Sequence, residues 1–286
     1  MRLFCMLLVL LWSELPASAA VQFDDSFEYP TCTDNASCIA ALNGTPWSLE
    51  NFDTTGYSGC TISTDQAHTG TRSFKLHYVA ADLGATGTPA CGFVRFPSPN
   101  LLEIYYRVWM RLSPDFSYAT INGNSKHMYF KFNTEPRFRI DSENGVGELL
   151  IDTDIDASVC PGTGFGPYDS CRYKAEYMSP PGPSVIVPVN QWICIQGHAK
   201  LNDPGVANGT VDLTINGVQT VLFTNRNFRD TGNSPTGLFD EIKFYRQAGF
   251  GDRYWDDLAI GDTLISCGSG GGGGTPPAAP INLSVH

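Results

Sequence analysis

The sequence predicts an all-β protein that folds as a β-sandwich of two antiparallel sheets. Apolar residues recur at every second position between residues 192 and 260, most clearly in 211–215 and 239–245. This period buries one face of a strand and leaves the other in water. The pair Asn216-Gly217 separates two such runs and is a strong β-hairpin signal. None of these runs has helical spacing, so we expect no helix longer than about three turns.

The same alternation, or a strand-like composition, predicts further strands elsewhere in the chain. Together these strands span one domain, residues 21–267. A single β-sandwich of roughly 200–250 residues is common. The strands expected from the sequence are residues 21–29, 71–78, 102–112, 126–132, 137–139, 148–156, 192–200, 211–217, 218–223, 239–245 and 254–260.

The two ends of the chain differ from this domain in composition. Residues 1–20 hold one Arg, an apolar core and a final small-residue pattern, which is typical of a cleaved secretory signal peptide. Residues 268–275 form a Gly-rich linker, and 276–286 resemble the first strand of a fibronectin type III module or act as a spacer. No later run approaches the ~20 apolar residues of a membrane span. We expect a secreted monomer, extracellular or periplasmic, without a membrane partner.

The cysteines predict disulfide bonds. Nine cysteines become eight when Cys5 leaves with the signal peptide, and an even count in an exported chain indicates pairing. Spacing does not fix the connectivity. Proximity along the chain suggests the pairs Cys32–Cys38, Cys60–Cys91, Cys160–Cys171 and Cys194–Cys267.

The charge balance argues against a nucleic-acid partner. The chain has 18 basic and 29 acidic residues, whereas phosphate binding needs a basic surface. Basic residues nevertheless concentrate between residues 105 and 139, where six face only two acids. An anionic polysaccharide is therefore compatible with this region. The six are Arg107, Arg111, Lys126, Lys131, Arg137 and Arg139.

One face of the strand at 102–112 combines rings and guanidinium groups. Tyr105, Arg107, Trp109 and Arg111 alternate with apolar residues. Rings can stack on pyranoses, and arginine can bind a carboxylate through two hydrogen bonds. This face can bind a sugar, or it can be a packed outer layer from which the arginine tips reach solvent. The sequence leaves both interpretations open.

A structural calcium ion is a further expectation. Asp25 and Glu28 belong to the first expected strand, and Asp257 to the last. Many extracellular jelly rolls pair such strands and hold calcium with carboxylates from both, together with backbone carbonyls. The alternative is that the three acids are solvated strand ends. We expect any such ion to be structural and no cofactor to be required.

The chain resembles jelly-roll, concanavalin A-like polysaccharide lyases similar to alginate and glucuronan lyases. The resemblance covers residues 102–260 and is a pattern of strands and turns. The residues that carry it are Trp192, Gln196, His198, Leu201-Asn202, Pro204-Gly205, Asn208-Gly209, Asn216-Gly217, Arg226, residues 239–245, Gly249 and Trp255-Asp256-Asp257.

The resemblance implies cleavage of an anionic, uronate-containing glycan by β-elimination. This chemistry neutralises the uronate carboxylate, removes the C5 proton and protonates the leaving O4. The resemblance implies that Lys126 and Arg137 or Arg139 serve the carboxylate, and that Tyr173 and Tyr177 match the catalytic tyrosines. Gln196 and His198 match a Gln-x-His pair found in such lyases, and Tyr245 is a further substrate-binding candidate.

Two other functions stay open. One is a non-catalytic carbohydrate-binding or adhesive module, which the linker favours. The other is a glycoside hydrolase, because Asp152, Asp154 and Asp156 alternate as paired carboxylates do in retaining enzymes. A lyase requires Lys126, one of the arginines at 137 and 139, His198 and a tyrosine to converge on the concave sheet. Pairing of the arginines with these aspartates would favour the binding module instead.

Overall fold

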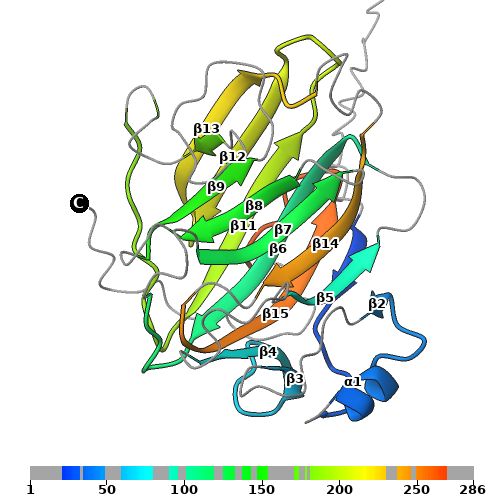
Figure 1. Ribbon diagram of the computed structural model, residues 1–286. Helices are drawn as coiled ribbons and strands as arrows, with labels where there is room; N and C mark the ends of the chain where they lie inside the picture. The colour runs from blue at the N-terminus through cyan, green and yellow to red at the C-terminus, as the bar shows by residue number, and fades with distance from the viewer. Residues whose placement is uncertain are drawn as a thin grey trace, which may run out of the picture.

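The computed structural model confirms an almost wholly β architecture of two antiparallel sheets (Figure 1). One short helix, α1 (Asn35–Ala41), accompanies them. None of the helical residues described forms a segment long and apolar enough to cross a bilayer. The structure describes residues 21–32, 35–48, 59–79, 90–95, 101–118, 125–132, 137–142, 147–153, 171–173, 178, 181–229, 237–245 and 249–268.

The first sheet, called sheet A, has eight strands. Strand β1 (Val21–Asp25) pairs with β15 at its side. The other seven strands lie in the spatial order β13 (Val218–Arg226), β12 (Gly209–Ile215), β11 (Trp192–Lys200), β6 (Glu103–Leu112), β15 (Gly251–Gly261), β4 (Ser73–Tyr78) and β3 (Gly59–Ser63).

The second sheet, called sheet B, has seven strands and lies against sheet A (Figure 1). Its strands follow the spatial order β10 (Cys171–Tyr173), β9 (Leu149–Thr153), β8 (Arg137–Ser142), β7 (Ser125–Phe132), β14 (Phe239–Tyr245), β5 (Ala90–Arg95) and β2 (Trp47–Ser48).

Alternation along each strand builds the core between the sheets. In β6, Ile104, Val108 and Met110 are fully buried and belong to one apolar cluster with Phe130 and Ile140 of sheet B. Successive strand residues point to opposite faces, so the residues between these apolar positions face outward. The functional candidates therefore lie on two separate outer faces, one for each sheet.

The expected strands are all present within the domain, with shifted ends. The run at 21–29 ends as a strand at Asp25, because Phe27 adopts a positive φ of 54° and its amide donates to the Asp25 carboxylate. Strands β2, β3, β5 and β10 were not expected as strands, whereas β9 lies within the expected run 148–156.

Two expected disulfides are confirmed, Cys32–Cys38 and Cys194–Cys267. Cys60 is also disulfide-bonded, but the expected partner Cys91 has no described side chain. The pair Cys160–Cys171, the signal peptide at 1–20, most of the linker and the segment 276–286 also lie outside what the structure describes.

Candidate functional site

The outer face of sheet B brings cations and a phenol into one cross-strand row. Arg139 of β8 pairs in register with Tyr129 of β7, which pairs with Lys243 of β14. Cross-strand partners share a face and lie about 5 Å apart. The Lys243 ammonium lies 5.6 Å from the centre of the Tyr129 ring. Lys126 of β7 is the cross-strand partner of Asp141, which lies two residues after Arg139 on β8 and therefore on the same face.

Carboxylates compensate the cations of this row. Arg139 forms an ion pair with the buried Asp152 at 2.9 Å, and its Nε lies 3.6 Å from Asp141. The ammonium of Lys243 lies 3.4 Å from Glu241. Asp152 is therefore a buried partner of Arg139. This is the arginine–aspartate pairing that would favour a binding module over a lyase. Asp154 and Asp156 lie outside the described residues.

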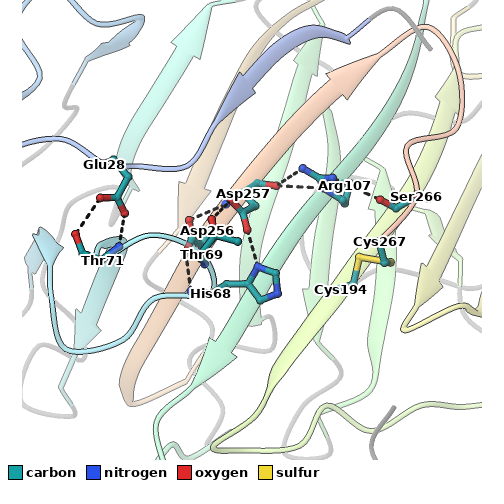
Figure 2. A network of polar contacts seen from close by, with 10 residues as sticks. All are labelled: Glu28, His68, Thr69, Thr71, Arg107, Cys194, Asp256, Asp257, Ser266 and Cys267. Atoms are coloured by element: carbon teal, nitrogen blue, oxygen red, sulfur yellow. Dashed lines mark hydrogen bonds and ion pairs between the residues drawn. A yellow bond between two sulfur atoms is a disulfide. The ribbon is translucent and has the colours of Figure 1, made fainter. Parts of the chain in front are cut away.

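The outer face of sheet A carries the other predicted residues and, like the sheet B row, in which Arg139, Tyr129 and Lys243 are 6%, 2% and 7% exposed, is partly covered. The segment from 262 to 267 crosses it, fixed by the Cys194–Cys267 disulfide (Figure 2). Arg107 donates to the carbonyls of Asp257 at 3.3 Å and Ser266 at 3.4 Å. Gln196 donates to the carbonyl of Ile265 at 2.5 Å. Burial lowers the pKa of Arg107, although the Asp257 charge opposes the shift.

Trp109 lies beneath a histidine on this face. The rings of His68 and Trp109 stack with centroids 3.7 Å apart, and Trp109 is only 4% exposed. Asp257 fixes that histidine, with a carboxylate oxygen 2.5 Å from Nδ1 of His68. Of the two interpretations of this face, the structure thus supports the packed outer layer for Arg107 and Trp109. Arg111, by contrast, keeps a solvent-accessible tip, which donates to Asn190 at 2.6 Å.

His198 sits between two acids at the far end of the same face. Its Nε2 lies 2.8 Å from Glu103 and its Nδ1 3.4 Å from Asp212, while its ring stacks on Tyr105 at 4.3 Å. Burial alone would lower the pKa of His198, but the bonds to both carboxylates outweigh it, so the pKa is raised. His198 and Gln196 are consequently on the layer opposite Lys126 and Arg139, and the expected convergence in one cleft is absent from the described structure.

The three acids expected to bind calcium all line one open cavity of about 270 Å³. Asp25 turns its carboxylate away to Trp47 and Tyr29, and burial raises its pKa. Glu28 accepts from the backbone and hydroxyl of Thr71. Among the described residues, no group of three or more His, Cys, Asp and Glu side chains is arranged to hold a metal ion.

A bulge positions Asp257 beside this cavity. The register between β15 and β6 shifts between Asp256 and Ala259, and Asp257 has a positive φ of 46°. Burial and the neighbouring Asp257 charge raise the pKa of Asp256 to about 8, although backbone amides donate to it. Burial opposes ionisation of Asp257, but bonds from His68 and Thr69 outweigh it and lower that pKa. Asp257 is thus the ionised member of the pair.

The remaining candidates divide between the core and the residues left undescribed. Tyr173 is fully buried in the apolar cluster, and its hydroxyl accepts from Arg226 at 3.3 Å. It therefore anchors β10 to the core. Tyr177 lies outside the described residues, and no side chain is described for Arg137 or Tyr245.

Solved structures that are similar to this chain include polysaccharide lyases. Cellulose induced protein Cip1 is 18% identical over 86% of this chain and all of its own, with a TM-score of 0.53. An endo-β-1,4-glucuronan lyase of the fungus Trichoderma reesei is 14% identical over 85% of this chain and 96% of its own, with a TM-score of 0.56. Alginate lyase Aly36B is 13% identical over 86% of this chain and all of its own, with a TM-score of 0.54.

The chain has the jelly-roll fold of polysaccharide lyases. No protein-family model matches the sequence, and no curated protein matches it. The likeness is therefore one of fold, as the sequence pattern over residues 102–260 predicted.

Sequence reasoning missed Tyr129 and Lys243 as members of the sheet B row. The signal was the alternation in 126–132 and 239–245, which sets both on the faces opposite Phe130 and Phe244. What the sequence lacked was the adjacency of β7 and β14, which are more than a hundred residues apart in the chain.

Proposed function

We propose that the protein is a secreted polysaccharide lyase that cleaves an anionic, uronate-containing glycan by β-elimination at the outer face of sheet B. The observation that carries this proposal is the row formed by Arg139, Tyr129 and Lys243, with Lys126 beside it. It supplies cations for a carboxylate and, in place of the expected His198, two other groups able to transfer protons on one face.

The chemistry assigns a role to each group. Arg139 and Lys126 bind the uronate carboxylate and stabilise the negative charge that develops when C5 loses its proton. Tyr129 and Lys243 are the proton-transfer pair: one takes the C5 proton, and the other protonates O4 as the C4–O4 bond breaks. The electron pair of the C5–H bond becomes the C4–C5 double bond of the product.

The substrates of similar structures support this substrate class. Mutants of alginate lyase Aly36B hold an alginate tetrasaccharide and a trisaccharide, and their TM-score against this chain is 0.53. Alginate and glucuronan are both uronate polymers. The disulfides support export, since such bonds persist in oxidising compartments. We also propose that the protein acts as a monomer.

A second candidate is glycan binding without cleavage. It is favoured by the ion pairs of Arg139 with Asp152 and Asp141. A guanidinium already compensated by two carboxylates offers less attraction to a uronate and has a structural role of its own. In this case the face would still bind a polysaccharide through Tyr129 and the lysines, but it would not convert it.

The decisive experiment incubates the full chain with alginate, polyglucuronate and other uronate polymers and follows the ultraviolet absorbance of the unsaturated product. We expect Tyr129→Phe to lower turnover by about 100-fold. Tyr105→Phe removes the same hydroxyl from the opposite layer and should leave turnover unchanged. Affinity electrophoresis in gels containing each polymer measures binding separately. Binding without product would favour the binding module, and absence of both would overturn the proposal.

We further propose a structural calcium ion between Glu28 and Asp257. Glu28 and Asp257 line the cavity described above together with Thr69 and Gly70, and calcium prefers carboxylate and carbonyl oxygens as ligands. Asp25 is not proposed as a ligand, because burial raises the pKa of its carboxyl, whereas the pKa values of Glu28 and Asp257 are lowered. Calcium should raise the melting temperature and a chelator should reverse the effect. Glu28→Gln should reduce this response; an equal response would exclude the site.

A further inference from the structure

The outer face of sheet A is divided into a covered part and an open part. Where the segment 262–267 crosses it, Arg107 and Gln196 are only 4% and 6% exposed. Toward the other end of β6 and β11, Arg111 and Trp192 are only partly buried. They are direct cross-strand partners, so their side chains lie next to each other on the outer face.

Arg111 is a cation without a carboxylate partner within the described part of the chain. Its one hydrogen bond goes to the side-chain oxygen of Asn190, at 2.6 Å. The acid on the adjacent strand, Asp252, is taken up by Lys75 at 2.9 Å and by His77. Arg111 therefore keeps most of its donors and its charge for a ligand, in contrast to Arg139 of sheet B.

Two rings lie on the same outer face as this guanidinium. Trp192 lies beside it on β11, and the His68 ring stands edge-on to Trp192 with centroids 5.7 Å apart. His68 is held rigidly, because Asp257 binds its Nδ1 and Trp109 lies flat beneath it. Its Nε2 has no partner among the described residues and is left for a ligand. A fixed imidazole ring, an indole and a guanidinium without a described carboxylate partner thus lie on the same outer face.

We propose that Arg111, Trp192 and His68 form an accessory subsite for a uronate residue of a polysaccharide, on the layer opposite the proposed catalytic face. The indole stacks on the pyranose, the guanidinium binds the carboxylate, and Nε2 of His68 hydrogen-bonds to a sugar hydroxyl. Charge complementarity selects an anionic sugar over a neutral one. This subsite goes beyond the proposed function, because it binds the polymer without taking part in its cleavage.

The test measures retardation of the full chain in native gels that contain alginate, polyglucuronate or neutral hydroxyethyl cellulose. Trp192→Ala and Arg111→Ala should each weaken binding to one of the uronate polymers by about tenfold, whereas the neutral polymer should retard all variants equally little. Lys200→Ala removes one exposed charge from the far end of β11 and serves as the matched control. It should bind like the unmodified chain.

Two conservative variants keep the test independent of folding. Trp192→Phe retains a ring and Arg111→Lys retains a charge, so both should bind better than the alanine variants at an unchanged melting temperature. Turnover of short oligosaccharides should be the same in all variants, which separates this subsite from the catalytic proposal. The proposal would be overturned if the Arg111, Trp192 and Lys200 variants were all retarded as much as the unmodified chain. It would also be overturned if all three lost binding to the same degree.

Discussion

Replacement of His198 by glutamine should destabilise the protein at acidic pH and much less at alkaline pH. The bonds to Glu103 and Asp212 raise the pKa of His198 above its ordinary value of 6.5, despite burial. The folded protein thus holds this proton more tightly than the unfolded chain does. The contribution to stability is complete below the unfolded pKa and disappears as the pH rises through the folded one.

The size of the effect follows from the contacts. The side chain of His198 is 13% exposed and that of Asp212 19%, but Glu103 is 39% exposed and therefore partly screened. Hydrogen bonds between charged groups at such sites stabilise by about 1–3 kcal/mol in total. We expect His198→Gln to lower the free energy of unfolding by about 1–2 kcal/mol near pH 5, and by less than half of that near pH 9.

Urea denaturation at several pH values measures this difference. His77→Gln is the matched control, because His77 also pairs with an acid but is 42% exposed, so its loss should cost little. A cost for His198→Gln that does not change with pH would refute the electrostatic explanation. The same variant should retain turnover, since His198 lies on sheet A. Loss of turnover at full stability would instead support the catalytic role that the resemblance implied.

Two further substitutions test the packing of sheet A. Gly197→Ala should destabilise the fold by about 2–3 kcal/mol, because an added Cβ would lie 2.2 Å from the Tyr106 hydroxyl; Gly59→Ala, with nothing within 4 Å, should be nearly neutral in the same urea titration. Replacing Cys194 and Cys267 by alanine opens a loop of 73 residues and should cost about 4 kcal/mol. In this double variant, faster proteolysis near residue 267 should accompany the lower melting temperature.

The fold was predictable because alternation is a local property of each strand. The alternating residues Val211, Leu213 and Ile215 predict a strand and its buried face from the local sequence alone. All three are buried as expected. The hairpin at Asn216-Gly217 is local in the same way, and it joins β12 to β13. The prediction of an all-β sandwich therefore needed only such local signals and no knowledge of contacts between residues far apart in the sequence.

The site was less predictable because it depends on which strands become neighbours. The sequence correctly placed Arg107, Arg111 and Trp109 on one face of β6, yet it could not reveal that a segment about 160 residues later covers part of that face. Arg107 meets Ser266 across a sequence separation of 159. Nor could it reveal that β6 and β8 belong to different sheets, which separates Arg107 from Arg139.

The two outer faces differ in how their cations are balanced, and this difference predicts how they would share a substrate. Sheets in a sandwich pack about 10 Å apart, so both sheets and the core between them separate the outward side chains of the opposite layers. A single short oligosaccharide cannot contact Arg139 and Arg111 together. A long polymer can be bound at Arg111 while another stretch, or another chain, lies on sheet B. The accessory subsite would therefore increase the rate on long or insoluble polymer, by keeping the protein bound to it. Loss of Arg111 should slow turnover of the polymer at low concentration but leave its rate at saturation unchanged, and a lower saturated rate would contradict a purely anchoring role.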